Sequence, residues 1–418
     1  MLQRKVTYRL YPNKVQGEIL SDLLYLHQRL YNTALEERIR LWKGKQESLS
    51  FSKQCKDLTY WRSYSPALAG MNAQSGQVTL KRLDLAFKAF FRRVKSGEKP
   101  GFPRFKSVQR YPGWGYKTHG DGWRFHHGEK KHGRLYLQGI GTVPVRGKAR
   151  TPGTPKTCEI VHRHGKWYAS ITINCEPQRE SGTKVVAFDW GVEAFLTLLT
   201  GEEALSQVPN PRHLRNQLEA LRALSKVISR KIVMAQKQSG RKKGFPVSNR
   251  LKKLFTQLNA LHGRIANQRH DFLHQVSKWM IQEFGLIAFE ELNIKKMVAS
   301  GGARKRGLNR EILSSSGGAF HEMVRYKAEE AGTWLMEAPT KELKPTQRCH
   351  ACWQAVKKKL SDRWHNCGCG ASCSRDENAV RTVMRWVEEV LASEGPGTGP
   401  ARSGRCLAVL KRETHAIA

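Results

Sequence analysis

Apolar and polar residues alternate at the start of the chain and then recur at helical spacing. The run from Arg4 to Leu10 alternates as a β-strand does and ends at Tyr11. Asn13 and Gln16 have the spacing of a helix capping box. The apolar positions that follow at intervals of three or four residues are Ile19, Leu23, Leu26, Leu30 and Ala34. We therefore predict a strand followed by a long amphipathic helix.

A second amphipathic helix is predicted around residue 90, and the composition changes after it. Leu83, Phe87, Phe90 and Val94 share one face of that helix. Residues 96–180 are rich in Gly, Pro and aromatic residues and contain short alternating runs, which indicate a small antiparallel β unit. Since the first strand has the same character, we expect the helices between them to be an insertion into one β domain.

Three acidic residues stand in related local settings. Asp189 and Glu290 each close an apolar run typical of a buried strand, and Asp376 follows Ser374, whose spacing to Glu377 is that of a capping box. Carboxylates from separate parts of a fold provide the oxygen ligands that divalent ions need, and two such ions promote phosphodiester hydrolysis. The pattern predicts a metal-dependent nuclease. Helix caps or ion pairs to nearby lysines are the alternative roles of these acids.

The charge of the chain favours a polyanionic partner. Lys and Arg number 73 against 35 Asp and Glu, which gives a net charge of +38 at pH 7. Duplex nucleic acid carries one charge per roughly 1.7 Å, so neutralising this excess takes a footprint of about 20 base pairs. Residues 220–270 hold 13 Lys or Arg and no acid, on two helical patterns separated by residues 240–246. A surface helix normally mixes both signs, so we expect this helical hairpin to lie along phosphates.

The cysteines are unevenly spaced, which favours a metal site over disulfides. Five of the nine lie between Cys349 and Cys373. Cys349, Cys352, Cys367 and Cys369 form two close pairs, as in a zinc ribbon, where Zn²⁺ supplies folding energy that a small unit lacks. The second pair has one spacer residue, so His350, His365 and Cys373 are alternative ligands. Buried thiols without metal are the other interpretation. The scattered cysteines, which we interpret as ordinary small hydrophobic residues, are Cys55, Cys158, Cys175 and Cys406.

Length and hydropathy set the remaining limits. A chain of 418 residues with 39% hydrophobic residues has room for two to four packed units. We find no leader at the amino end and no apolar run of about 18 residues. We therefore expect that the protein is neither exported nor inserted into a membrane. We expect it to be cytosolic or nuclear.

Taken in order along the chain, these motifs resemble those of the TnpB family, transposon-encoded RNA-guided DNA endonucleases related to the ancestors of type V CRISPR nucleases. The resemblance covers nearly the whole chain. The matching segments are 9–13 (RLYPN), 83–91 (LDLAFKAFF), 101–106 (GFPRFK), 267–274 (NQRHDFLH), 289–293 (FEELN) with Met297, Tyr326-Lys327 with Gly332, and 375–379 (RDENA). Two departures stand out: Trp190 replaces the small or aliphatic residue usual after the first Asp, and the ribbon has Cys-x-Cys with Cys373 beside it. Neither removes a carboxylate.

The resemblance implies an α/β multidomain protein: an RNase H-like (RuvC) nuclease core with a helical insertion and a zinc ribbon, preceded by an antiparallel β-barrel-like wedge domain with a helical recognition insertion. Asp189, Glu290 and Asp376 are then the catalytic acids, holding two Mg²⁺ ions. The expected parts are the wedge domain at 1–12 and 96–180, the recognition domain at 13–95, the nuclease core at 181–209, 281–345 and 374–390, the basic hairpin at 210–280, the zinc ribbon at 346–373 and a disordered tail at 391–418.

The implied partners are a guide RNA from the transposon locus and double-stranded target DNA, in a prokaryotic cytoplasm and on the nucleoid when bound to target. Gln77 and Lys81 are the candidates for reading a short motif beside the target, since Gln suits adenine and Lys suits guanine or phosphate. Arg375 either contacts the scissile phosphate or forms a surface ion pair. The other expected nucleic-acid contacts are Arg82, Arg104, Arg230, Lys231, Arg264 and Arg269.

Three functions remain open from the sequence. The first is a guided endonuclease that cuts both DNA strands, in which base pairing reads the target sequence. The second is a guided DNA-binding repressor without productive cleavage. The third is a guide-independent transposase that acts on transposon ends.

Overall fold

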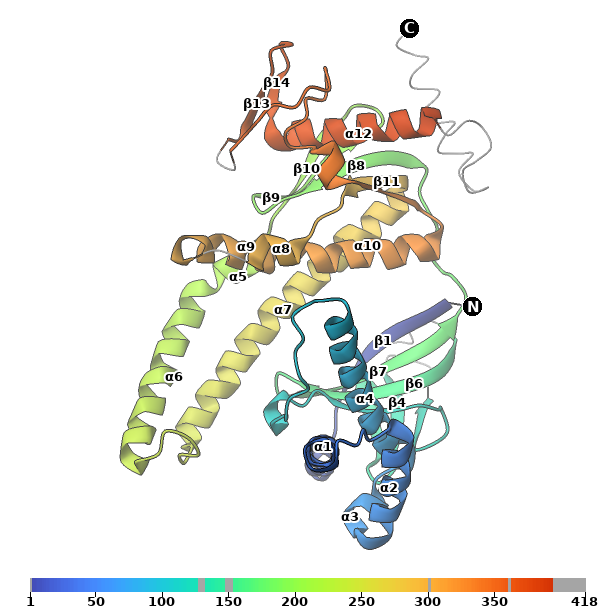
Figure 1. The fold of residues 1–418 in the computed structure, drawn as a ribbon, viewed down its shortest axis with the longest axis vertical. Helices are drawn as coiled ribbons and strands as arrows, with labels where there is room; N and C mark the ends of the chain where they lie inside the picture. The colour runs from blue at the N-terminus through green and yellow to red at the C-terminus, as the bar shows by residue number, and fades with distance from the viewer. Residues whose placement is uncertain (1, 127–131, 147–152, 300–301, 360–361, 394–418) are drawn as a thin grey trace. The chain divides into compact units, whose positions relative to one another are not determined.

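The computed structural model describes residues 2–126, 132–146, 153–299, 302–359 and 362–393 (Figure 1). The chain divides into two compact units, Met1–Glu176 and Pro177–Ala418. Most of the expected tail, together with Cys406, lies outside the described residues. Among the described helices, none is long and apolar enough to cross a membrane.

The first unit is built on a seven-stranded sheet in which every strand pair is antiparallel. Its strands, in spatial order, are β2 (Gly113–Tyr116), β6 (Thr154–Arg163), β7 (Lys166–Cys175), β1 (Leu2–Leu10), β5 (Gly141–Arg146), β4 (His132–Leu137) and β3 (Trp123–His126). The first strand therefore pairs between strands that come more than 130 residues later. This confirms the prediction that it belongs to the same β structure as residues 96–180.

Along the chain, four helices follow β1 before the next strand of that sheet. They are α1 (Lys14–Lys45), α2 (Phe51–Tyr64), α3 (Pro66–Gly70) and α4 (Ala73–Lys95), and the short η1 (Val108–Arg110) comes after them. The predicted capping box is confirmed, because Gln16 N donates to Asn13 Oδ1 at 2.8 Å and Asn13 N donates to Gln16 Oε1 at 3.1 Å. The apolar face predicted for the second helix is buried only at its beginning. Leu83 is fully buried, whereas Val94 is 50% exposed.

The second unit contains a mixed five-stranded sheet in the order β10 (Leu205–Pro209), β9 (Ala194–Thr200), β8 (Lys184–Trp190), β11 (Phe284–Glu290) and β12 (Trp334–Ala338). The pairs β8–β11 and β11–β12 are parallel, while β8–β9 and β9–β10 are antiparallel. One face of the sheet packs against α7 (Asn249–Glu283) and α10 (Gly317–Ala331), and the other packs against α12 (Arg375–Ser393). The central strands are therefore buried on both faces, which explains their continuous apolar sequences.

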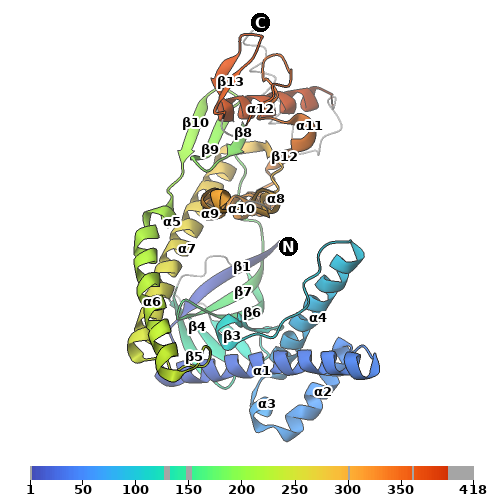
Figure 2. The same ribbon diagram turned by 60° about the vertical axis from the view of Figure 1, so that its left-hand side comes forward.

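The remaining elements connect or extend this sheet. The helices are α5 (His213–Asn216), α6 (Leu218–Ser239), α8 (Ile294–Ala299), η2 (Ala303–Lys305), α9 (Arg306–Ser315) and α11 (Thr340–Leu343), and the strands are β13 (Trp364–Asn366) and β14 (Ser372–Ser374). Helices α6 and α7 contact each other, so the two predicted helices on either side of residues 240–246 are confirmed (Figure 2). The small β13–β14 hairpin immediately precedes α12 and lies within the cysteine-rich segment.

Candidate functional site

Two of the three acids lie at the same end of the five-stranded sheet because their strands run parallel in matched register. Phe289 on β11 pairs with Phe188 on β8, and the acids Glu290 and Asp189 each follow by one residue. Side chains alternate between the two faces of a strand. Since Ala187 packs on the α12 side of the sheet, Asp189 points to that side as well.

The third acid reaches the site from α12. Glu377 N donates to Ser374 Oγ at 3.1 Å, so the predicted N-cap is confirmed and Asp376 lies in the first turn of the helix. Val380 and Val383, on the next two turns, pack against the sheet face to which Asp189 points. The packing of α12 therefore brings the first turn of the helix to the end of the sheet that carries the other two acids.

The electrostatics of Asp189 show that the three carboxylates are neighbours. Burial raises its pKa well above the ordinary value, and the nearby charges of Asp376 and Glu290 raise it further. Arg375 opposes this increase, and its Nε lies 3.5 Å from Asp376 Oδ1. Burial also raises the pKa of Glu290. Because the charges of Asp376 and Glu290 raise the pKa of Asp189, a divalent cation bound there would relieve this repulsion, and carboxylate oxygens are suitable ligands for such an ion.

One member of this site was not expected from the sequence. The Thr340 hydroxyl lowers the pKa of Glu290 by hydrogen bonding and also donates to the backbone oxygen of Glu291. Thr340 begins α11 just after β12, the strand that pairs with β11. The apolar run Trp334–Ala338 was the available signal, since it reads as a third parallel strand whose end lies beside Glu290.

A second candidate metal site is formed by the four thiols of Cys349, Cys352, Cys367 and Cys369, whose sulfur atoms all lie within 4.8 Å of one another. The shortest separations are 3.5 Å between Cys352 Sγ and Cys367 Sγ and 3.7 Å between Cys349 Sγ and Cys369 Sγ. Among the described residues, these four cysteines are the group of three or more His, Cys, Asp or Glu residues whose ligand atoms all lie within 4.8 Å of one another. The oxygens of the acidic trio are more widely spaced.

The environment of the thiols favours metal binding. A hydrogen bond from the Cys369 backbone N–H is the largest cause that lowers the pKa of Cys367 to about 7, and side-chain hydrogen bonds with the neighbouring thiols add to it. The same thiol–thiol hydrogen bonds raise the pKa of Cys352, to about 12. Tetrahedral thiolate sets of this kind suit Zn²⁺. The alternative ligands have other neighbours: His350 Nδ1 lies 3.1 Å from Asn378 Oδ1, and His365 contacts Lys358.

The candidate recognition residues on α4 already make contacts within the protein. Gln77 accepts from Lys117 at 3.2 Å. Lys81 donates to Asp84 at 3.3 Å. Arg82 contacts the backbone oxygen of Gly113 and lies 3.0 Å from Glu159 Oε1. Gln77 and Lys81 are one helical turn apart and so share a face of α4.

The other candidate nucleic-acid contacts are spread over both units. Arg104 is exposed beyond α4 in the first unit. In the second unit, Arg230 and Lys231 lie on α6, and Arg264 and Arg269 lie on α7. Arg230 and Arg264 are exposed, while Lys231 and Arg269 are partly buried. These four residues lie on the two contacting helices of the basic hairpin, and Arg375 lies beside the acids.

Three family models match the chain. The model described as "Probable transposase" (OrfB_IS605) matches residues 168–301, which include Asp189 and Glu290. The model described as "Cas12f1-like, TNB domain" matches residues 318–383, which include the four thiols and Asp376, and the one described as "Helix-turn-helix domain" matches residues 1–47. These matches confirm the resemblance to the TnpB family. In this protein, residues 2–45 form one strand and one long helix.

Curated relatives match over most of the chain. A Streptomyces pristinaespiralis protein named "Putative RNA-guided DNA endonuclease" is 28% identical over 396 residues, covering 92% of this chain and 89% of its own length. InsQ of Escherichia coli (strain K12), which carries the same name, is 26% identical and covers 87% of each chain. Among solved structures, one titled "Cryo-EM structure of the Cas12f1-sgRNA-target DNA complex" is 12% identical with a TM-score of 0.49, covering 91% of this chain and 98% of that one. Such a likeness is too low to bear on function.

Proposed function

We propose that this protein is an RNA-guided DNA endonuclease of a transposable element, which cleaves target DNA beside a short motif by metal-dependent phosphodiester hydrolysis. The observation that carries the proposal is the convergence of Asp189, Glu290 and Asp376 at one end of the five-stranded sheet. The relatives named as RNA-guided DNA endonucleases support it, since they match 92% and 87% of this chain.

The topology of the second unit supports an RNase H-like (RuvC) core. Three neighbouring strands, β10, β9 and β8, are antiparallel hairpin partners, and β11 and β12 extend the sheet in parallel on the other side of β8. The strand order 3-2-1-4-5, with helices on both faces, is that of RNase H-type nucleases. We further propose that the sheet of the first unit is the barrel-like wedge, and that the domain limits follow those expected from the sequence.

The acids would hold the divalent ions, with Mg²⁺ as the natural choice for three carboxylates. When bound, two such ions activate the attacking water and stabilise the leaving oxygen. Asp189 and Glu290 are positioned by rigid parallel strands, so their spacing is maintained by the sheet. Arg375 supplies a cation beside Asp376, where it is suited to contact the scissile phosphate.

The other proposed parts have separate tasks. The four thiols would hold Zn²⁺ and stabilise the small hairpin that precedes α12. Base pairing with a guide RNA would read the target, while Gln77 and Lys81 would read the adjacent motif. The cationic side chains of α6 and α7 would lie along the phosphates of the duplex. Such contacts are independent of the nucleotide sequence.

The proposal is tested by cleavage of a plasmid library randomised beside one target, with the protein co-expressed with its native flanking transcript. The parent should cut sequences that share one adjacent motif, and Asp189→Asn should abolish cutting because it removes one charged ligand. Glu329→Gln, which changes an exposed acid on α10, is the matched control and should cut as the parent does.

The other outcomes select the competing functions. Cutting by Asp189→Asn at the parental rate refutes the assigned site. Tight binding of RNA and target by the parent without cleavage at saturating Mg²⁺ supports a guided repressor. Cutting or joining of transposon ends with no RNA present supports a transposase.

A further inference from the structure

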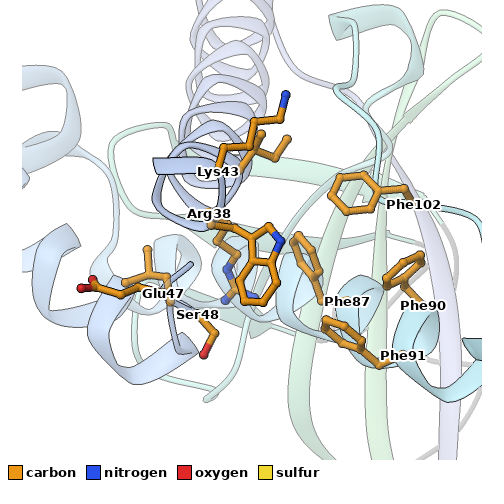
Figure 3. Close-up of a pocket in the computed structure, with 11 residues that line it drawn as sticks. Arg38, Lys43, Glu47, Ser48, Phe87, Phe90, Phe91 and Phe102 are labelled. Atoms are coloured by element: carbon orange, nitrogen blue, oxygen red, sulfur yellow. The ribbon is translucent and has the colours of Figure 1, made fainter. Parts of the chain in front are cut away.

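An apolar pocket opens in the first unit between α1 and α4, away from every residue discussed so far as a site. Its volume is about 490 Å³, which is within the range of small-molecule cavities. One wall is the end of α1 with Trp42, another is the end of α4 with Phe87 and Phe91, and Phe102 closes one side (Figure 3). Five of its eleven lining residues are therefore aromatic: Trp42, Phe87, Phe90, Phe91 and Phe102.

The rings of this pocket are exposed to an extent that packing does not explain. Trp42 is 55% exposed, Phe91 56% and Phe102 49%. Phe102 meets Phe87 of α4 edge-on, with ring centroids 5.6 Å apart at 88°. The guanidinium of Arg38, on α1, lies 5.1 Å from the Phe87 centroid. Ordered aromatic faces left open to solvent mark a binding site for a flat ligand.

The charges around the pocket suit a phosphate backbone. The last turn of α1 carries Lys43 and Lys45, and the last turn of α4 carries Arg92, Arg93 and Lys95, all of them exposed. A partner with an aromatic ring and flanking negative charges matches this combination, and a nucleotide strand has both. Sequence-tolerant binding of single strands uses this arrangement, with bases on aromatic faces and phosphates on surrounding cations.

The polar residues at the pocket favour RNA over DNA. Glu47 and Ser48, in the link between α1 and α2, line it on the side away from the phenylalanines (Figure 3). A carboxylate repels phosphate but accepts a hydrogen bond from a ribose 2′-hydroxyl, and a serine hydroxyl can do the same. The 2′-hydroxyl is the group by which proteins distinguish RNA from DNA.

We infer that this aromatic pocket binds an unpaired, unstacked nucleobase of single-stranded RNA, with its ribose facing Glu47 and its phosphates on the cations at the ends of α1 and α4. The inference rests on the proposed function in one respect: the guide RNA is the single-stranded RNA that this protein would bind. It deepens that function by giving the first unit a base-holding site that acts independently of the acids.

The test is binding of the full chain, without Mg²⁺, to a 12-nucleotide single-stranded RNA and to its deoxy counterpart, by fluorescence anisotropy. The measurement is made at about 0.5 M salt, where contacts to phosphate are weakened and stacking contributes a larger share. Trp42→Leu and Phe91→Leu should each weaken RNA binding by roughly tenfold. Tyr64→Leu is the matched control, because Tyr64 is 72% exposed on α2 outside the pocket, and should bind as the parent does.

A second measurement does not depend on any variant. RNA that contains 4-thiouridine should crosslink to Trp42, Phe91 or Phe102 in the unaltered protein, as located by mass spectrometry. Parental affinity in both leucine variants, or crosslinks confined to other residues, would overturn the inference. Equal affinity for RNA and DNA would overturn the choice of RNA, and tight capture of an acidic peptide at the same rings would favour a protein partner instead. Asp189→Asn should bind RNA as the parent does, so loss of cleavage and loss of base binding are distinguishable.

Discussion

Lys327 provides the most direct test of the energetics in the second unit, because it is a cation that is only 1% exposed. Its ammonium donates to the backbone oxygen of His274 at 2.9 Å and to Ser277 Oγ at 2.6 Å, both on α7. Burial, together with the charges of Arg179 and Lys278, lowers its pKa from 10.5 to about 7. The lysine therefore opposes folding at neutral pH.

The size of this effect follows from the pKa change. A decrease from 10.5 to about 7 corresponds to roughly 5 kcal/mol at about 1.4 kcal/mol per pKa unit. Relaxation and water penetration reduce such costs, and the two hydrogen bonds return about 1 kcal/mol each. We therefore expect Lys327→Met, which keeps the apolar stem and removes the charge, to stabilise the protein by about 1–3 kcal/mol at pH 6.

The stabilisation by Lys327→Met should depend on pH. The folded-state pKa of Lys327 lies below its unfolded value, so below pH 7 the residue is charged in both states and the full cost is present. Between about pH 7 and 10.5 the unfolded state binds more protons, so parental stability rises with pH and the advantage of methionine shrinks. The advantage should thus be clearly larger at pH 6 than at pH 9.

The assay is denaturant unfolding at both pH values, followed by near-UV signals of the tryptophans. Lys295→Met, at an exposed position on α8, controls for loss of a positive charge and should change stability little. A methionine variant less stable than the parent at pH 6 would show that the hydrogen bonds outweigh the buried charge. An advantage of equal size at pH 6 and pH 9 would contradict the assigned titration.

Three further predictions address the metal sites and the packing below the sheet. Cys352→Ser should lower bound zinc from one ion per chain to a small fraction, measured by plasma mass spectrometry, and unchanged zinc would exclude this thiol as a ligand. Gly317→Ala should destabilise the protein by about 1–3 kcal/mol, because a Cβ there would lie 2.5 Å from a ring atom of Trp190; Gly318→Ala, with its nearest neighbour at 3.9 Å, should be nearly neutral in the same melting experiment. In the presence of a chelator at pH 7, Asp189→Asn should have a higher melting temperature than the parent, because the raised pKa of Asp189 means that its ionised carboxylate opposes folding. Added Mg²⁺ should then raise the melting temperature of the parent more than that of the variant. Equal responses to Mg²⁺ would contradict binding at this residue.

Local sequence signals predicted the elements that hold the site but not the surroundings of those elements. The Asn13 and Ser374 caps and the two strands that end in acids depend on neighbours within a few residues, and the structure has them where they were expected. The apolar face expected to continue to Val94 is not covered there, since Val94 is 50% exposed. Periodicity shows that a face is apolar, not whether the protein itself covers it.

The long-range contacts could not be read from the sequence at all. The Thr340 hydroxyl reaches Glu290 only because β12 pairs with β11, and the Lys327 ammonium is buried only because α10 packs on α7. Each contact joins segments about 50 residues apart, and sequence spacing alone does not specify such pairings. The three acids are also far apart in the sequence, so their spacing alone did not predict that they meet. The resemblance to the family motifs predicted it.

The position of α12 has a consequence for how the protein is made. Asp189 and Glu290 are on strands that leave the ribosome before α12, while Asp376 arrives only with that helix, which also covers one face of the sheet. A nascent chain that has not reached Asp376 therefore has neither the complete acid set nor a covered sheet. If the three acids act together as proposed, a chain that ends before Asp376 cannot cut DNA.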